Sequence, residues 1–418
     1  MPEQINIKQF FTPSLSGVSN NLVSKTKGDR VIWGIVVILT LVSLLVVYSS
    51  TGSLAYKYSK STESYLFKQF AFIILGVLVI YFAHRVNYTI YSRVAKLLFL
   101  ISIPLLIYTY FFGTKLNEGS RWIMLPVINM TFQTSDMAKL ALFMYLSRQL
   151  SRKQNVIKDF KQGFLPVVIP VAIICLLIAP ANLSTAMLIA GTSFMLMFIG
   201  RVNTKHILLT IGIALVPVIL LLTIAVKYYD KTEHKAKDLP AVFSVGRIPT
   251  WVGRIQTFIY SNKEDENEKL YQINQAKIAI ANGGWLGKGP GNSQQRNFLP
   301  HSYSDFIYAI IIEEYGLVGA SFMVFIYLLF LYRCIRLYRK CPFAFGAFLA
   351  LALSFTLVIQ AIANMGVAVG AFPNTGVTLP LVSMGGSSFL FTCLSIGIIL
   401  SVARNVEQLE GTKEVISQ

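Results

Sequence analysis

Long apolar runs separated by shorter polar stretches recur along almost the whole chain. A helix needs roughly 20 apolar residues to cross about 30 Å of hydrocarbon, because it rises about 1.5 Å per residue. The pattern predicts an all-α polytopic membrane protein of about ten spans. They lie near residues 31–50, 69–84, 94–112, 134–150, 164–180, 183–200, 206–226, 305–332, 343–366 and 385–403.

Composition excludes a water-soluble globular enzyme. Of the 418 residues, 54% are hydrophobic and only 13% are charged, and the mean hydropathy is +0.59. Soluble domains carry about a quarter of their residues as charges. The net charge is +18, and the basic residues lie mostly between the apolar runs. This placement favours anionic lipid headgroups over nucleic acid as their binding partner. The four cysteines have no metal-type spacing, so neither a zinc site nor a disulfide framework is indicated.

Charges in the short loops predict the orientation. Loops 85–93, 148–161, 201–205 and 333–340 are richer in Lys and Arg than loops 57–68 and 115–121. Cytoplasmic loops carry the excess of such residues. Both termini are therefore expected in the cytoplasm, with tails 1–30 and 404–418 flanking a membrane domain over 31–403. The long segment 227–304, between the seventh and eighth spans, is then extracytoplasmic.

The composition of this long segment changes partway. Residues 227–240 and 261–269 are highly charged, whereas 271–304 combines five glycines with aromatic and amide side chains. A solvated spacer has no need of aromatic residues beside such glycines. We expect 271–304 to fold as a cap over the outer mouth of the bundle.

Asp305 is the first candidate for chemistry. A carboxylate at the membrane edge is costly unless it is paired or functional, and burial would raise its pKa toward the range of a general base. The alternative is that Asp305 caps the eighth helix, where its oxygen would accept free N–H groups. Glu313 and Glu314 follow about 12–14 Å further along the helix, so we expect them to pair inside the bundle, away from the same aqueous site.

Basic residues form the second set. Arg121 and Lys139 lie near the outer end of the fourth span, and Asp136 is placed on the same helix face as Lys139. Excess cations outside call for an anionic partner such as a lipid-linked phosphate. Snorkelling to headgroups is the alternative for any one of them, except for Lys139, whose place in a span beside Asp136 favours a functional role. Further outer cations are Arg247, Arg254, Lys277, Lys288 and Arg296.

Clustered glycines form the third set. Glycines let backbone N–H groups approach phosphate oxygens closely, and a helix N-terminus adds a positive dipole end. Close helix packing explains the second cluster equally well. The clusters are Gly283, Gly284, Gly287, Gly289 and Gly291, and Gly385–Gly386 before Ser387–Ser388.

Tryptophan and histidine add less. Trp122, Trp251 and Trp285 fit either an interfacial aromatic belt or a platform on which a sugar stacks. His206, His234 and His301 are scattered along the chain, and none is assigned a catalytic role.

Five segments follow one another in a fixed order along the chain. They are GSRWIML (119–125), QTSDMAK (133–139), YQINQAKIAIANGGWLGKGPGNS (271–293), FLPHSYSDFIYAIIIEEYG (298–316) and NTGVTLPLVSMGGSS (374–388). With these segments the chain resembles, over nearly its whole length, the SEDS family of polytopic cell-wall proteins. Within that family it resembles the cell-division branch more than the elongation branch.

The resemblance implies a peptidoglycan glycosyltransferase that joins lipid II disaccharides at the outer membrane face, for septal wall synthesis in division. Asp305 matches the family's essential outer-loop aspartate. It would deprotonate the 4-hydroxyl of the acceptor sugar in an inverting transfer. Arg121, Lys139, Lys277 and Lys288 would neutralise the leaving diphosphate, with or without a divalent ion such as Mg or Mn. Trp122, Ser387 and Ser388 would complete the substrate site.

The resemblance also implies partners. A class B penicillin-binding transpeptidase and other division membrane proteins are expected, and nucleic acid is not. The chain departs from the family pattern at Asn182, where the family usually has an aspartate, and at QTSD, where it usually has QPSE. No family role is therefore carried over to Asn182. Two other functions stay open, a flippase for the lipid-linked precursor and a non-catalytic scaffold.

Overall fold

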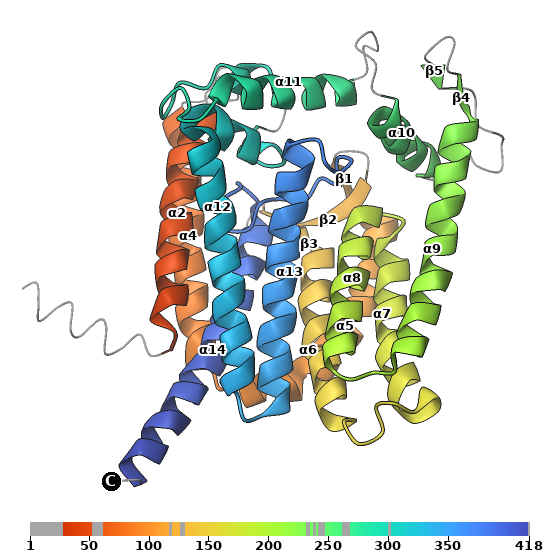
Figure 1. Cartoon of the computed structure of the whole chain (residues 1–418), viewed down its shortest axis with the longest axis vertical. Coiled ribbons are helices and arrows are strands. Elements are labelled where there is room, and N and C mark those ends of the chain that lie inside the picture. Colours follow the sequence, from red (N-terminus) through yellow and green to blue (C-terminus); the bar gives the residue numbers. More distant parts are fainter. Residues whose placement is uncertain are drawn as a thin grey trace, which may run out of the picture.

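The computed structural model describes residues 28–51, 62–116, 119–125, 130–230, 235–236, 240, 247–260, 268–299 and 302–416. Helices dominate this part of the chain (Figure 1). They are α2 (Arg30–Ser50), α4 (Thr62–Arg85), α5 (Tyr88–Phe112), α6 (Thr134–Arg152), the π-helix η2 (Phe160–Phe164), α7 (Leu165–Ile178), α8 (Leu183–Ile199), α9 (Thr204–Lys227), α10 (Ile248–Ile259), α11 (Glu268–Gly283), the 3-10 helix η4 (Gln295–Asn297), α12 (Ile307–Lys340), α13 (Ala344–Ala368) and α14 (Ser387–Ile416).

The predicted polytopic architecture is confirmed. Among the described residues, eight helices are long and apolar enough to cross a membrane: α2, α4, α5, α7 with η2, α9, α12, α13 and α14. The other two predicted spans correspond to α8, which is apolar but has 17 residues, and to α6, which is less apolar and largely buried. Each predicted apolar run therefore became a helix.

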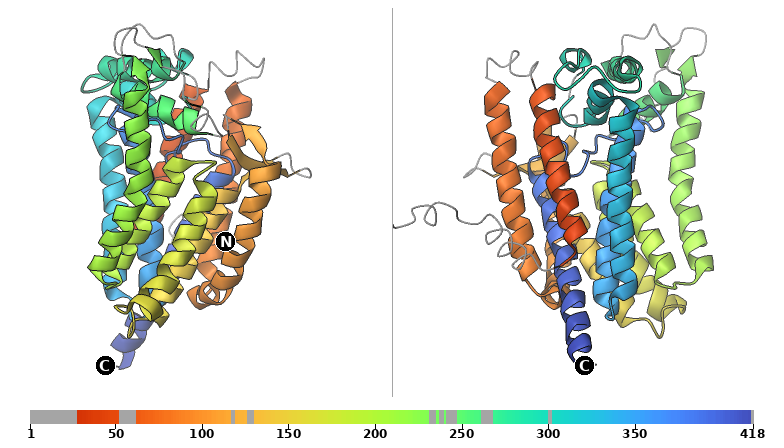
Figure 2. Two further views of the ribbon diagram at one scale, coloured as in Figure 1. Left: turned by 90° about the vertical axis from the view of Figure 1, so that its right-hand side faces the viewer. Right: turned by 60° about the vertical axis from the view of Figure 1, so that its left-hand side comes forward.

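The helices form one bundle with α13 at its centre. In the most apolar window of α13, 83% of the residues are buried, and in α14 72% are. In contrast, α9 is only 17% buried in its window and stands at the edge of the bundle (Figures 1 and 2). A helix that is apolar all round yet unburied by protein is suited to a lipid environment.

One end of the bundle is covered by α10 and α11, and we call it the cap end (Figure 1). The first residues of α2 and the last turns of α14 lie at the opposite end, where Gly28 N donates to Glu407 Oε2. There Asp29 caps α2 by accepting from Val31 N and also pairs with Arg333 of α12 at 2.7 Å. Both described ends of the chain thus share one face of the membrane domain.

The cap predicted over 271–304 is confirmed, since Ala276, Ala279 and Leu299 join the main hydrophobic core. Another part of the cap rests on α9, where Gln256 of α10 donates to the carbonyls of Ala225 and Tyr228, both at 3.0 Å. Amide donors here satisfy carbonyls at the end of α9 that have no helical partner.

A small antiparallel sheet between α5 and α6 was not predicted from the sequence. It contains β1 (Thr114–Leu116), β2 (Gly119–Leu125) and β3 (Met130–Gln133) in that order. Trp122 pairs with Gln133 in its register, and the Gln133 N–H donates to Ser387 Oγ at 3.0 Å. The sheet therefore joins the start of α6 to the start of α14. A second, two-stranded sheet pairs β4 (Tyr229–Asp230) with β5 (Lys235–Ala236).

The predicted eighth span differs from the structure at its cap end. Helix α12 begins at Ile307 rather than 305, and it is interrupted at Gly316, which has φ 66° and ψ −167°. Only glycine adopts such a backbone conformation without large strain. The break separates a short helical piece, 307–315, from the long apolar piece that follows.

Candidate functional site

Asp305 lies in a tight turn, residues 302–306, that leads into α12. Three successive backbone carbonyls of this turn accept hydrogen bonds from α13 and from the loop before α14. The donors are Met384 N to Tyr303 O (3.1 Å), Ser383 Oγ to Ser304 O (2.7 Å) and Asn364 Nδ2 to Asp305 O (3.0 Å). The backbone under Asp305 is thus fixed by main-chain contacts that do not use its carboxylate.

The Asp305 side chain is partly exposed at the cap end. The cap residue of α12 is Phe306, and Asp305 precedes it by one position. The expectation that Asp305 serves as the helix cap is therefore not met at that position. A further anchor is Ser302, the first residue of the turn, whose Oγ donates to Ser50 O at the end of α2 (3.1 Å).

Lys139 and Asp136, which the sequence places on one helix face, form an ion pair. Lys139 Nζ lies 3.2 Å from Asp136 Oδ1, and the two side chains are only 16% and 5% exposed. Lys139 also donates to Gln360 Oε1 on α13 at 3.0 Å, and Gln360 in turn donates to Thr378 O. The second oxygen of Asp136 is buried and has no hydrogen-bond partner among the described residues.

Helix α13 brings the Lys139 pair and the Asp305 turn together. Gln360 and Asn364 are four positions apart on it, hence neighbours on one helix face. Gln360 holds Lys139, while Asn364 holds the Asp305 carbonyl and, at 2.7 Å, the Val377 carbonyl. A cation and a candidate base are therefore linked through one turn of a buried helix.

Sequence reasoning missed Gln360 and Asn364. Both are almost fully buried, with 5% and 1% of their surface exposed. The available signal was their chemistry, since a polar side chain in an otherwise apolar span is expensive and is retained for a partner. In the sequence, both lie within the apolar run 343–366.

Ser387 and Trp122 lie close to the same region. Ser387 Oγ accepts from the N–H of Gln133, the residue before α6, and Trp122 is the strand partner of Gln133. Ser388, the next residue, is 8% exposed and lies in the first turn of α14. The predicted substrate residues Trp122, Lys139 and Ser387 thus converge at the start of α6.

The remaining predicted cations are dispersed. Lys277 of α11 reaches toward the end of α13, because its Cε would lie 3.4 Å from a Cβ built on Gly370. Arg254 of α10 donates to Asn374 O at 3.2 Å, and Arg247 donates to Ala181 O. Arg121 belongs to β2, but its side chain is outside the described part of the structure.

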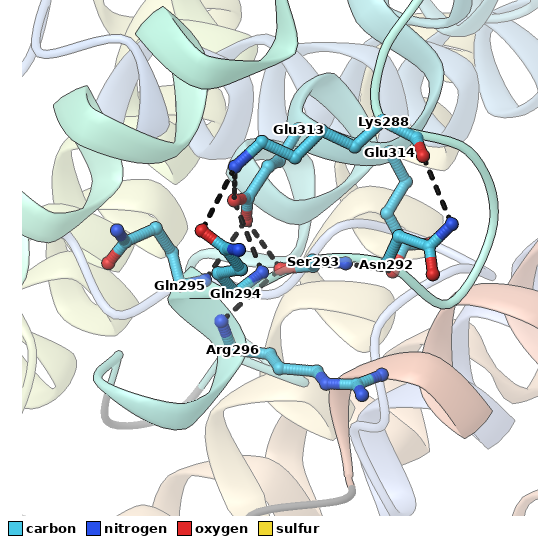
Figure 3. A network of polar contacts seen from close by, with 8 residues as sticks. All are labelled: Lys288, Asn292, Ser293, Gln294, Gln295, Arg296, Glu313 and Glu314. Carbon is cyan, nitrogen blue, oxygen red and sulfur yellow. Dashed lines mark hydrogen bonds and ion pairs between the residues drawn. The ribbon is translucent and has the colours of Figure 1, made fainter.

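Lys288 has a different partner from the one expected. Its ammonium lies 3.2 Å from Glu313 Oε1, a carboxylate with no exposed surface (Figure 3). The sequence predicts that Glu313 and Glu314 pair deep inside the bundle, and the predicted depth was wrong. The break at Gly316 keeps them at the cap end, where they face the loop 288–297.

The outer glycines allow two backbone segments to touch. A Cβ on Gly283 would lie 2.1 Å from Ile312 O, and one on Gly287 would lie 2.2 Å from Glu314 O. Lys288 N and Gly289 N donate to the carbonyls of Glu313 and Glu314, both at 2.9 Å. Close packing of the two backbone segments therefore explains why positions 283 and 287 are glycine, and a phosphate contact is not needed to explain them. Trp285, at the apex of this glycine turn, is 76% exposed.

Other expectations concern metals and single residues. Within the described residues, no group of three or more His, Cys, Asp or Glu is placed to hold a metal ion, so no step is assigned to the divalent ion. All four cysteines are free. Asn182 caps α8 by accepting from Thr185 N. His206 packs against Phe160 and Phe164, whereas His234 and His301 lie outside the described residues.

Comparison with known proteins agrees with this arrangement. Residues 29–408 match a family model for FtsW, RodA and SpoVE, described as cell cycle protein. A probable peptidoglycan glycosyltransferase FtsW of Trichlorobacter lovleyi is 30% identical over 91% of this chain and 94% of its own. Stage V sporulation protein E of Bacillus subtilis is 30% identical over 91% and 98%.

Solved structures share the fold. A chain from a peptidoglycan synthase complex, described as coordinating polymerization and crosslinking, has a TM-score of 0.69 at 21% identity, and that match covers 91% of this chain and 99% of the other. The rod shape determining protein RodA of Thermus thermophilus has a TM-score of 0.62 at 22% identity, over 90% and 97%.

Proposed function

This chain belongs to the FtsW/RodA/SpoVE family of cell cycle proteins, and from that premise we propose that it is a peptidoglycan glycosyltransferase. Its substrate would be lipid II, and its product a glycan strand made at the outer face of the bacterial cytoplasmic membrane. Curated relatives named FtsW, about 30% identical over most of the chain, support this reading and a role in septal wall synthesis.

The proposed reaction is an inverting glycosyl transfer. The 4-hydroxyl oxygen of the acceptor GlcNAc forms a bond to the anomeric carbon of the donor MurNAc, and its proton passes to the Asp305 carboxylate. The bond from that carbon to the phosphate oxygen breaks, and the electron pair leaves with undecaprenyl diphosphate. A carboxylate whose backbone is fixed can hold the hydroxyl in the attacking geometry, which lowers the barrier by orientation.

Lys139 is the cation best placed to stabilise the leaving diphosphate. Its ammonium is shielded from water and linked through Gln360 and Asn364 to the Asp305 turn. Preorganised charge in such a site stabilises a developing anion more strongly than charge in water. Arg121 and Lys277 are the further candidates, with Trp122, Ser387 and Ser388 at the sugar. Lys288, which pairs with Glu313, is removed from this set.

The observation that carries the proposal is the shared anchoring of a base and a cation. The Asp305 turn and the Lys139–Asp136 pair are both hydrogen-bonded to one turn of α13, at the end of the bundle that the cap covers. A polymerase with an extracytoplasmic substrate needs both groups on one side of the membrane. With both termini cytoplasmic, as the loop charges predict, the cap end is the outer side.

We also propose a class B penicillin-binding transpeptidase as partner. A chain of a peptidoglycan synthase complex that coordinates polymerization and crosslinking has the same fold, which supports pairing of a polymerase with a crosslinking enzyme. Addition of the purified transpeptidase is expected to raise the polymerisation rate.

The direct test is glycan formation from purified lipid II by the purified chain in detergent or nanodiscs. Wild type should make polymer, whereas Asp305→Asn and Asp305→Ala should make none while remaining folded. Asp159→Asn, which removes a carboxylate from the loop at the opposite end, is the control and should leave the rate unchanged. Arms with Mg²⁺, Mn²⁺ and EDTA measure metal dependence.

Three outcomes would contradict the proposal. Full polymerisation by Asp305→Ala would remove the assigned base. Transport of labelled lipid II across vesicles without any product chain would favour the flippase, and no activity in either assay would favour the scaffold.

A further inference from the structure

Two adjacent carboxylates at the cap end have no part in the reaction described above. Glu313 is 0% exposed and Glu314 is 1% exposed. Burying two neighbouring acids in a membrane protein is expensive unless their oxygens are well supplied with donors. Both lie near the end of the short helical piece 307–315. They therefore belong to the same rigid element as the residues that follow Asp305.

Glu313 collects its donors from one loop of the cap. All four come from residues 18 to 25 positions earlier in the chain (Figure 3). They are Lys288 Nζ (3.2 Å), Ser293 Oγ (2.5 Å), Gln294 N (3.2 Å) and Gln295 N (3.2 Å). Two of the four are backbone N–H groups, so the carboxylate fixes the course of the main chain at 294–295.

Glu314 connects the same loop to α2. Ser49, in the last turn of α2, donates its hydroxyl to Glu314 Oε1, and Ser293 N donates to the same oxygen at 3.4 Å. Arg296 completes the link by donating to Ser49 O at 3.0 Å. Three segments therefore meet at the two acids: the loop 288–297, the start of α12 and the end of α2.

Asp305 lies inside the loop that these contacts close. The chain leaves the acids at residues 293–295, runs through the turn 302–306 and returns to them at Glu313. On the other side the carbonyls of the turn are held by Ser383, Met384 and Asn364. Release of the first set of contacts removes the support of the Asp305 turn on the α12 side.

We propose that Glu313 and Glu314 are positioning residues that hold the Asp305 turn in its reactive geometry by clamping the loop 288–297 and α2 to the start of α12. The inference rests on the proposed function, because the reactive geometry is the one that the proposed glycosyl transfer requires. The clamp itself consists of the hydrogen bonds described above. It also assigns Lys288 to the clamp, as the counter-charge of Glu313.

Only a carboxylate satisfies all the donors that face Glu313. An ionised carboxylate has two accepting oxygens, whereas the amide of Gln has one and presents an NH₂ group to the rest. In Glu313→Gln that NH₂ group would face either Lys288 Nζ and Gln294 N, which share Oε1, or Ser293 Oγ and Gln295 N, which share Oε2. The isosteric change therefore opens the clamp without altering packing volume.

The kinetic test compares Glu313→Gln and Glu314→Met with wild type in lipid II polymerisation. Methionine removes the one Glu314 oxygen that accepts from Ser49 and Ser293, whereas the amide of Gln would retain it. Misplacement of a reacting group by about 1 Å lowers a rate on the order of 100-fold, so kcat should fall about 10- to 100-fold. KM should change less than about twofold, because the diphosphate and sugar contacts are elsewhere. Glu313→Asp, which keeps the charge but is shorter, should also lower kcat.

A second test does not depend on activity. Asp305→Cys reports on the turn through its rate of labelling by a membrane-impermeant maleimide, in a background with Cys175 and Cys341 replaced by alanine. The two remaining native cysteines are buried and stay unlabelled. Adding Glu313→Gln should raise the labelling rate about tenfold, because local opening exposes the turn.

Glu410→Gln is the matched control, since Glu410 is 51% exposed and pairs with Lys340 at the opposite end. It should leave both kcat and labelling unchanged. Equal labelling with and without Glu313→Gln, or a Glu313→Gln effect confined to KM, would overturn the clamp. If wild type makes no glycan, the proposed function fails, and the labelling test still decides on the clamp.

Discussion

Asn364 Nδ2 donates to the backbone carbonyl of Asp305 at 3.0 Å, joining the most buried of the described spans to the residue proposed as the base. The contact uses the main chain of Asp305 and does not occupy its carboxylate. Asn364 also holds Val377 O at 2.7 Å, so one amide fixes two loops at the cap end.

Asn364→Leu should therefore lower both the stability of the protein and its rate of glycan synthesis. Leucine has a similar volume but leaves two partly buried carbonyls without this donor, a loss of about 1–3 kcal/mol of stability. Glycan synthesis should fall in the same variant because the Asp305 turn loses an anchor. Thermal unfolding and lipid II polymerisation measure the two effects.

The control for this variant is Thr356→Val on the same helix. The Thr356 hydroxyl donates to Ala352 O within α13, and its loss should change stability by less than about 1 kcal/mol. If the Asn364 and Thr356 variants behave alike, the amide contributes nothing specific to the site.

Lys139 has a structural and a proposed catalytic role, and the two can be separated. Lys139→Met leaves Asp136 buried and unpaired, which should lower stability by about 3–5 kcal/mol. Adding Asp136→Leu removes the stranded charge and should restore most of the melting temperature. Polymerisation should stay low in the double variant, because the cation for the diphosphate is still missing.

Recovery of both stability and activity in the double variant would reduce Lys139 to a partner for Asp136. The control is Lys205→Met, which removes a lysine from the exposed start of α9 near the opposite end of the bundle. It should alter neither the melting temperature nor the polymerisation rate.

Variants of Lys288 test whether this residue belongs to the clamp or to the substrate site. If Lys288 acts through Glu313, Lys288→Met should lower kcat of lipid II polymerisation with little change in KM, and Lys288→Arg should restore most of the rate. A ligand that already holds the diphosphate in the bound substrate would also raise KM when removed. Steady-state kinetics over a range of lipid II concentrations separates the two results.

Gly316 is predicted to be intolerant of any side chain. Its backbone lies in the region open only to glycine, and an added Cβ would be 2.3 Å from Trp285 O. Gly316→Ala should lower stability by about 3 kcal/mol or more. Gly34→Ala, at a helical site with open space around it, should be neutral or slightly stabilising. Equal melting temperatures for the two variants would contradict the assigned break.

The spans could be predicted from the sequence because hydrophobic length is a local property. The apolar runs around 343–366 and 206–226, for example, became α13 and α9 with boundaries shifted by at most two residues. The Lys139–Asp136 pair was equally accessible, since three positions on a helix bring side chains together. Asp305 stood out because it interrupts the edge of an apolar run.

Other features depend on contacts between distant segments. The break at Gly316 forms because Leu317 N and Val318 N donate to the carbonyls of Gly284 and Trp285, which no local pattern encodes. Without that break, the two acids of α12 were placed too deep in the bundle. The partners of Lys288 and Lys139 across the bundle were hidden for the same reason.

The short helical piece 307–315 sets the rotation of the Asp305 turn relative to the two buried acids. Asp305 precedes it, the two buried acids lie near its far end, and Gly316 stops it. Each residue of a helix turns the chain by about 100°, so inserting or deleting one residue here would rotate the Asp305 turn by that angle relative to the two acids. The length of this piece is thus constrained as tightly as the identity of its two acids.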